Sequence, residues 1–243
     1  MIIMDKYYLT DQLYKQDDHL FFEKNDKNIK LTTKNWHVYL NDYGWNKLNK
    51  QWIKKLNSYL ERPENNSRFG VFDCGENGDC LFHCISYALN EHFTYDSYDS
   101  NELRTLLSEN ISEEDYHMII EYYRIFKSCG DFDEDWDLEK INFEIFKKKI
   151  KEGGNDYWGD FFMILMLKKT LQINFIILSS NDITKEYYYY SMNMDYDKDN
   201  KTVLLLYENE NHFKLMGYFQ DGKMNILFND KKLPIEIRQL ITN

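Results

Sequence analysis

Apolar positions follow a helical period through the middle of the chain and a strand-like pattern in its last third. Helical spacing predicts helices over 80–90, 101–110, 112–130, 136–150 and 161–171. Apolar runs predict strands over 173–178, 185–191 and 203–207 and a hairpin made of 213–219 and 224–228, and 69–72 is expected to be a short lead-in to the helical region. Helices first and strands second predict an α+β fold, with helices packed on a mostly C-terminal mixed sheet.

The first 66 residues have a different pattern from the rest. Short polar-aromatic segments precede one amphipathic stretch, 45–60, in which Trp45, Trp52 and Leu56 share a helical face. The polar segment 62–67 follows and contains Pro63, which makes it the best candidate for a boundary. We therefore predict a partly helical N-terminal extension over 1–66, of unknown role, and a second domain over 67–243.

Composition narrows the class of protein. A chain of 243 residues that is 43% hydrophobic can bury one full core. A net charge of −11 argues against nucleic acid as a partner, because non-specific binding to phosphates needs a basic surface. No apolar run approaches the roughly 20 residues that cross a bilayer, and the N-terminus does not read as a signal peptide. Four cysteines in this setting favour a reducing, intracellular compartment and no membrane partner.

The most informative segment is 74–84, where a glycine-containing loop leads into an apolar helix that starts at Cys80. At the first turn of a helix, unpaired backbone N–H groups and the positive end of the helix dipole favour thiolate over thiol, which makes a cysteine nucleophilic. A buried structural cysteine is the alternative. His212 begins a strand-like run far downstream, and a cysteine with a distant histidine is typical of papain-like hydrolases.

A zinc site is the other chemistry that this segment raises, because Cys74, Cys80, His83 and Cys84 cluster in the sequence. Their spacing contains no CxxC pair, and no second pair with ligand spacing follows. We therefore expect neither a metal nor another cofactor. His83 and Cys84, one turn beyond Cys80, are expected to be an ordinary helix residue and a packed thiol, respectively.

Four segments together resemble the ovarian tumour (OTU) family of cysteine proteases, which are deubiquitinases. They occur in the family's order between about 70 and 228, and their residues are most similar to those of the branch found in large DNA viruses. The four segments are Asn77-Gly78-Asp79-Cys80-Leu81-Phe82-His83, Leu103-Arg104, Tyr157-Trp158-Gly159-Asp160 and Asn211-His212-Phe213.

The resemblance implies a papain-like OTU fold and cleavage of the isopeptide bond at the C-terminus of ubiquitin or a ubiquitin-like modifier, without a cofactor. It implies Cys80 as nucleophile, His212 as general base and Asn77 as a further site residue, with the backbone N–H groups of Gly78–Cys80 holding the oxyanion. It also implies a viral protein that acts inside the host cell, in the cytoplasm or in association with the virion.

Two positions depart from the family pattern. Asn77 stands where the family usually has Asp, and Lys214 stands two places after the histidine, where many members have the Asp or Asn that orients it. Residues two apart in a strand share a face, so Lys214 raises the alternative of a ubiquitin-binding pseudoenzyme or scaffold without a complete triad. The residue that orients His212 stays open among four candidates: Asn77, Asn209, Asn211 and Asp73.

Overall fold

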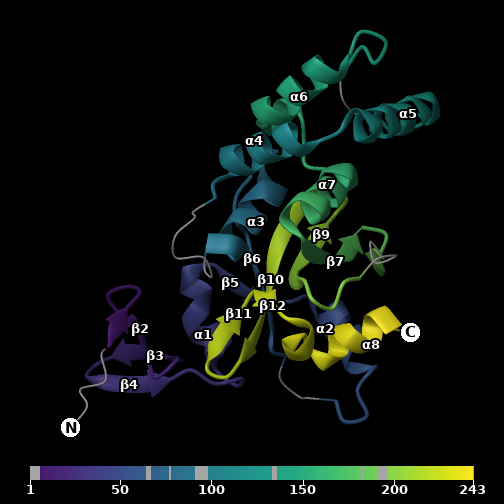
Figure 1. The fold of residues 1–243 in the computed structure, drawn as a ribbon. Coiled ribbons are helices and arrows are strands. Elements are labelled where there is room, and N and C mark those ends of the chain that lie inside the picture. Colours follow the sequence, from purple (N-terminus) through teal and green to yellow (C-terminus); the bar gives the residue numbers. More distant parts are fainter. Residues whose placement is uncertain are drawn as a thin grey trace.

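The computed structural model describes residues 6–63, 67–76, 78–90, 98–132, 136–181, 183–190 and 196–242. At its centre is an eight-stranded sheet (Figure 1). Six of its strands follow the order β5-β6-β10-β9-β7-β8, and the other two, β11 and β12, pair with β10 and β9. These strands are β5 (Trp45–Lys47), β6 (Phe69–Phe72), β7 (Ile173–Asn181), β8 (Glu186–Tyr190), β9 (Lys201–Glu208), β10 (His212–Gln220), β11 (Lys223–Asn225) and β12 (Leu227–Phe228).

The sheet is mixed, because β7 runs parallel to β9 whereas the other pairs are antiparallel. Six of its strands follow residue 172, so the predicted α+β fold with a mostly C-terminal mixed sheet is confirmed. The strands predicted at 173–178, 185–191 and 203–207 correspond to β7, β8 and β9, whereas 69–72, expected only as a short lead-in, forms strand β6. The predicted hairpin is present as β10 and β11, and its last two residues form β12, which pairs with β9.

Helices cover both faces of the sheet (Figure 1). Alternate residues of β7 point to opposite sides, so Phe175 and Ile177 join one buried cluster while Ile176 and Leu178 join the other. The first cluster includes α3 (Cys80–Asn90) and α7 (Phe161–Leu171), and the second includes α2 (Lys50–Asn57) and α8 (Ile235–Thr242). The site described below lies on the α3 side.

Three more helices extend the α3 side: α4 (Ser100–Asn110), α5 (Glu113–Cys129) and α6 (Phe143–Glu152). The predicted ends of α5 are confirmed, because Ser112 forms a capping box with Asp115 and Gly130 ends the helix in the left-handed region at φ 82°. The helix predicted from 136 begins only at Phe143. Asn142 accepts a hydrogen bond from the Ile145 N–H and so sets the start of α6.

The predicted helix over 45–60 is wrong at its beginning. Trp45–Lys47 forms β5, which pairs with β6, and the helix starts after Asn49, whose side chain accepts hydrogen bonds from the N–H groups of Gln51 and Trp52. The boundary predicted at residue 66 falls between α2 and β6 and stays a prediction. Side chains from before it, including Trp45 and Trp52, are nevertheless buried in the two clusters beside the sheet.

Several elements have no counterpart in the sequence predictions. A separate four-stranded sheet, seen at the lower left of Figure 1, lies beside the β10–β11 turn, where the Leu20 N–H donates to the Gly222 carbonyl at 2.8 Å. Its strands are short: β1 (Tyr7–Tyr8), β2 (Leu13–Gln16), β3 (His19–Lys24) and β4 (Lys27–Lys30). Among the described residues, the other additions are α8, a short helix and 3₁₀ turns: α1 (Trp36–Leu40), η1 (Asn41–Tyr43), η2 (Gly154–Asp156) and η4 (Asp230–Lys232).

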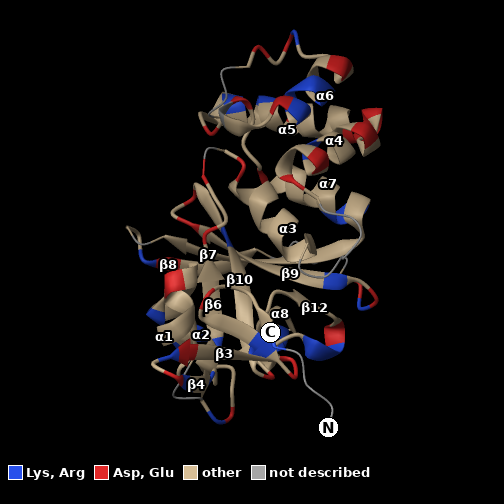
Figure 2. Cartoon of the chain, turned by 90° about the vertical axis from the view of Figure 1, so that its left-hand side faces the viewer, with Lys and Arg blue, Asp and Glu red and all other residues tan. Residues whose placement is uncertain are grey.

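Two surface properties bear on partners. Among the described helices, none combines the length and the apolar character that a membrane span requires. On the face shown in Figure 2, Lys and Arg are interspersed with Asp and Glu and do not gather into one basic surface.

Candidate active site

Cys80 is the first residue of α3, directly after a loop that two glycines shape. Gly75 and Gly78 have φ values of 141° and 84°, a backbone region that side chains disfavour, so the loop can turn sharply into the helix. The Cys80 side chain is only 6% exposed, and its helix is fixed by Leu81 and Phe82, which are fully buried. Cys80 therefore lies at the N-terminus of a helix, as the sequence predicts.

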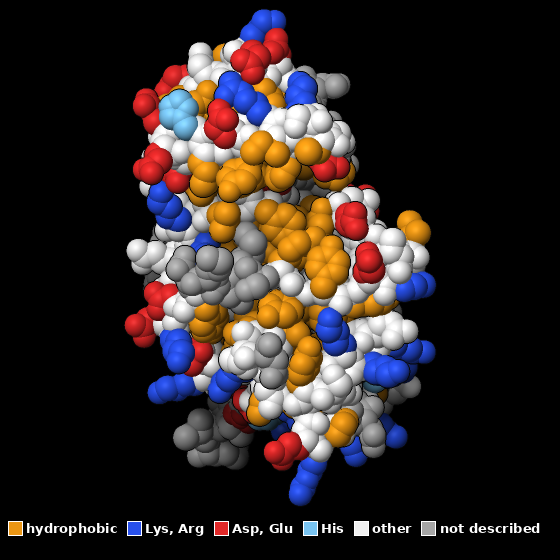
Figure 3. Space-filling model, turned by 90° about the vertical axis from the view of Figure 1, so that its right-hand side faces the viewer, with side chains coloured by type: hydrophobic (Ala, Val, Ile, Leu, Met, Phe, Trp, Pro, Cys, Tyr) orange, Lys and Arg blue, Asp and Glu red, His pale blue; other side chains and the backbone are white. Residues whose placement is uncertain are grey.

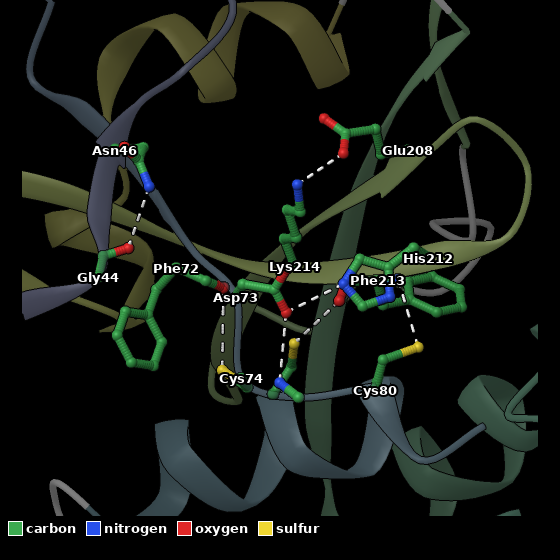
Figure 4. A network of polar contacts seen from close by, with 12 residues as sticks. Gly44, Asn46, Phe72, Asp73, Cys74, Cys80, Glu208, His212, Phe213 and Lys214 are labelled. Carbon is green, nitrogen blue, oxygen red and sulfur yellow. Dashed lines mark hydrogen bonds and ion pairs between the residues drawn. The ribbon is translucent and has the colours of Figure 1, made fainter. Parts of the chain in front are cut away.

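His212 comes from the opposite end of the chain, as the first residue of β10. The next residue, Phe213, joins strand and helix, because its N–H donates to the Cys80 sulfur at 3.4 Å and its carbonyl accepts from the Cys84 thiol at 3.6 Å. These contacts hold α3 against β10 and bring Cys80 and His212 together (Figure 4).

Asp73 is the carboxylate that contacts the histidine. Its Oδ1 lies 3.0 Å from the His212 Nε2. The sheet produces this contact: antiparallel pairing of Phe72 with Leu215 places the end of β6 beside the start of β10. In Figure 4, the His212 ring lies between Asp73 and Cys80. Asp73, one of the candidates for orienting the histidine that the structure describes, makes a hydrogen bond to its ring.

Both neighbours favour the protonated imidazole. The hydrogen bond with the Cys80 side chain, followed by that with Asp73, raises the pKa of His212 to about 9, against the opposing effect of partial burial. The histidine therefore keeps its proton at neutral pH while the sulfur lies beside it.

Lys214 does not oppose this arrangement. Its Nζ forms an ion pair with the Glu208 carboxylate of the neighbouring strand β9 at 2.6 Å. In Figure 4, the Lys214 side chain extends toward Glu208 and away from Cys80. The cation that the sequence places on the same strand face as the histidine is thus neutralised by a carboxylate.

The remaining predicted residues have different surroundings. Asn77 lies outside the described residues, so its role stays a prediction. Asn211 lines the cleft next to Cys80, whereas Asn209 lies in the β9–β10 turn with a φ of 52°. His83 packs against Gly75, where a Cβ would meet its ring, and Cys84 is fully buried, which raises the pKa of its thiol well above the ordinary value.

An ion pair between Asp79 and a buried arginine anchors the loop in front of Cys80. Asp79 Oδ1 accepts from Arg104 Nε at 2.7 Å and from the Gly154 N–H at 3.2 Å. The Arg104 side chain is fully buried and also donates to the carbonyls of Ile150 and Tyr157. In the sequence, Arg104 stands out only as part of a family motif, because no local pattern shows which acid it meets.

Two hollows meet at Cys80. A groove of about 540 Å³ runs along one side and is lined largely by aromatic residues, Phe161 and Tyr207 among them. A second, more polar hollow of about 450 Å³ contains Asp73, Glu76 and His212. Both are bordered by Gly78, Cys80, Trp158 and Asn211. The sulfur therefore lies where an extended chain could pass from one hollow into the other.

The described residues contain no group of three or more His, Cys, Asp or Glu side chains arranged to hold an ion. The chemistry that the site offers is that of a thiol, an imidazole and a carboxylate in a row.

Comparison with known proteins gives one family. The family model described as OTU-like cysteine protease matches residues 76–213, more than half of the chain. No curated protein matches the chain.

Several solved structures are similar at low identity. An ovarian tumour (OTU) domain in complex with ubiquitin is 17% identical, with 72% of this chain and 81% of that chain covered and a TM-score of 0.41. An OTU deubiquitinase from Wolbachia pipientis bound to ubiquitin is 15% identical, covers 68% of this chain and 98% of its own, and has a TM-score of 0.42. The Hazara virus OTU bound to ubiquitin is 11% identical, with coverages of 90% and 97% and a TM-score of 0.35.

Proposed function

Because the chain belongs to the family of OTU-like cysteine proteases, we propose that it is a deubiquitinase that hydrolyses the isopeptide bond at the C-terminus of ubiquitin. Cys80 is the nucleophile, His212 is the general acid and base, and Asp73 orients the histidine. The observation that supports these roles most is the row of three side chains, with His212 between the Cys80 sulfur and the Asp73 carboxylate.

The reaction proceeds in two steps. The Cys80 sulfur attacks the carbonyl carbon of the isopeptide bond, and the proton held by His212 passes to the leaving amine of the substrate lysine. Water then attacks the resulting thioester while His212 takes up its proton, which releases the carboxyl terminus of ubiquitin and the free thiol. The raised pKa of His212, about 9, supports this assignment, because the imidazole must hold a proton when the substrate amine leaves in the first step.

The loop before Cys80 supplies the groups for the oxyanion. The backbone N–H groups of Gly78, Asp79 and Cys80 are the proposed donors, and the Arg104–Asp79 pair keeps their loop in place. Asn77 is proposed to assist them through its side-chain amide.

An apolar surface beside the groove fits ubiquitin as the partner. The exposed side of α5 carries large hydrophobic side chains, which continue the aromatic lining of the groove: Met118, Tyr122, Ile125 and Phe126. Figure 3 shows apolar side chains gathered in a broad band across one face of the molecule. Exposed apolar area of this extent is typical of a docking surface. We propose that ubiquitin docks here, with its tail in the groove and the lysine side in the polar hollow.

Hydrolysis of isopeptide-linked diubiquitin tests the proposal. The wild-type protein should release monoubiquitin, and neither Cys80→Ser nor His212→Ala should do so above background. If the wild-type protein binds ubiquitin but does not cleave diubiquitin, the result contradicts the proposal and favours the pseudoenzyme alternative. A ubiquitin-like modifier as preferred substrate, an intracellular setting and a viral origin stay predictions.

A further inference from the structure

Two thiols that the proposed reaction does not use come to the same place from different elements. Cys84 lies one turn into α3, and its thiol donates to the Phe213 carbonyl at 3.6 Å. Cys74 follows the end of β6, and its thiol donates to the Phe72 carbonyl at 3.9 Å (Figure 4). Antiparallel pairing of Phe72 with Leu215, continued by two residues, sets Cys74 opposite Phe213. The strand end and the helix therefore bring the two sulfurs together.

The two thiols also contact each other. Burial, followed by a hydrogen bond with Cys74, raises the pKa of the Cys84 thiol well above its ordinary value. Cys74 is half-buried and packs against the same apolar cluster that contains Cys84. The fourth cysteine, Cys129, is exposed at the end of α5. Cys74 and Cys84 are thus a pair with a contact already made.

The two members of the pair differ in their access to solvent. Cys84 is fully buried. Cys74 lines a hollow of about 430 Å³, whose other described walls belong to α3: His83, Ser86, Tyr87 and Asn90. This hollow shares no described lining residue with the two hollows that border Cys80. A small oxidant can therefore reach Cys74 without passing Cys80, and Cys84 lies behind it as the thiol that reacts next.

The backbone at Cys74 also carries the acid of the active site. Asp73 directly precedes it, and Asp73 Oδ1 contacts His212 Nε2 at 3.0 Å and accepts from the Gly75 N–H at 3.3 Å. The turn is tight, because a Cβ added to Gly75 would lie 2.9 Å from the His83 ring. A disulfide brings two sulfurs to about 2 Å, much closer than two thiols can approach, so the backbone around Cys74 has to shift. Such a shift moves Asp73 away from His212.

We infer that Cys74 and Cys84 form a reversible disulfide that switches the active site off. With diamide as oxidant, the Cys74 sulfur adds to the N=N bond, and the Cys84 sulfur then attacks Cys74 and displaces the hydrazine. The two thiols lose two protons and two electrons, and the hydrazine takes up both. Hydrogen peroxide gives the same disulfide with two waters as products. Formation of the disulfide does not depend on the proposed function, whereas the loss of activity rests on it.

Mass spectrometry of the Cys80→Ala protein tests whether the disulfide forms. After diamide treatment and unfolding, N-ethylmaleimide should label Cys129 alone, whereas untreated protein should also take label at Cys74 and Cys84. Cleavage after Glu76 separates Cys74 from Cys84 in the sequence, so the two peptides should stay joined until dithiothreitol is added. Label on Cys74 and Cys84 after oxidation, or a disulfide to Cys129, would overturn the inference.

Hydrolysis of ubiquitin-aminocoumarin tests the effect on the active site. Diamide should lower the activity of the wild type at least about 10-fold, because His212 loses its orienting acid, and dithiothreitol should restore it. Cys74→Ser, whose hydroxyl can still donate to the Phe72 carbonyl, should resist diamide. Cys129→Ser is the matched control and should respond as the wild type does.

Two outcomes of this assay would overturn the switch: equal inhibition of Cys74→Ser and the wild type, or full activity of protein that carries the disulfide. If the wild type cleaves no ubiquitin substrate before oxidation while Cys80→Ala still forms the disulfide, the proposed function and the switch are both overturned, and the thiol pair stands.

Discussion

His212 connects three parts of the chain that are distant in sequence. Its own strand β10 provides the ring, β6 ends directly before its partner Asp73, and α3 starts with the sulfur beside it. Neither contact follows from the sequence near position 212, where the charged residues within two positions are Glu210 and Lys214. The sheet order, with β6 next to β10, is what supplies the carboxylate.

Asp73→Asn should lower kcat/KM by at least about 10²-fold, because the amide cannot stabilise the imidazolium as a carboxylate does. Ubiquitin-aminocoumarin hydrolysis measures the change. Glu208→Gln is the matched control, since Glu208 pairs with His212 through the strand backbones while its carboxylate forms an ion pair with Lys214, and it should stay within about 3-fold of wild type. Wild-type activity in Asp73→Asn would show that another group orients His212.

The stability that His212 contributes should depend on pH. Its pKa is about 9 in the folded protein against an ordinary 6.5, so the folded state binds the proton more tightly than the unfolded state. The contribution is complete below pH 6.5 and is lost as pH rises through 9. Urea unfolding at several pH values should show a free-energy gap between wild type and His212→Gln that narrows over this range. A gap that stays constant or widens contradicts the proton linkage.

At the scale of elements, the segment between α6 and α7 is built around one buried side chain. Arg104 reaches from α4 to Asp79 in front of α3 and to carbonyls on either side of Gly153. Gly153 has a φ of 62° and a ψ of −156°, a combination that glycine alone adopts readily, and a Cβ there would collide with the guanidinium. Close backbone approach to Arg104 thus depends on this glycine.

Gly153→Ala should lower the free energy of unfolding by about 2–4 kcal/mol, since it combines backbone strain with a clash against a side chain that has no room to move. Gly130→Ala is the matched control: its φ is 82°, yet nothing lies within 4 Å of the added Cβ, so about 1–2 kcal/mol is expected. Urea denaturation compares the two. Equal losses would mean that the packing against Arg104 contributes nothing.

The sequence predicts elements better than it predicts their contacts. Local signals set α5, because Ser112 and Gly130 act on neighbouring backbone groups. They also place Cys80 at a helix start. Contacts between strands are different: β5 consists of three residues whose Trp45 fits a helical face equally well, and only pairing with β6 decides its conformation. Asp73 stays one of four candidates for the same reason, as its contact depends on strand order.

At the scale of the whole molecule, the segment before residue 67 contributes to the protease fold. Trp52 is fully buried, and its indole N–H donates to the Ser179 carbonyl of β7 at 3.1 Å, while Trp36 stacks on Phe219 of β10. Without α2, the sheet face formed by Ile176 and Leu204 would lose part of its cover. The boundary predicted near residue 66 marks a change of pattern in the sequence, whereas side chains from both sides of it are buried in the same clusters.

A fragment that starts at residue 67 should accordingly fail to fold cooperatively. Circular dichroism during thermal unfolding should show a single sharp transition for the full chain and a broad or absent one for the fragment, because large buried side chains such as Trp52 typically contribute about 3–5 kcal/mol each. A fragment that unfolds as sharply as the full chain would establish residues 1–66 as a separate extension.

The central claim is that Cys80 is the sulfur presented to the C-terminus of ubiquitin. Ubiquitin with an electrophile at that terminus tests it most directly, by mass spectrometry of the intact adduct and of its peptides. One ubiquitin should attach per chain, on the peptide that contains Cys80, and Cys80→Ala or heat-unfolded protein should give no adduct. Attachment at the exposed Cys129 or the buried Cys84 instead would contradict the account.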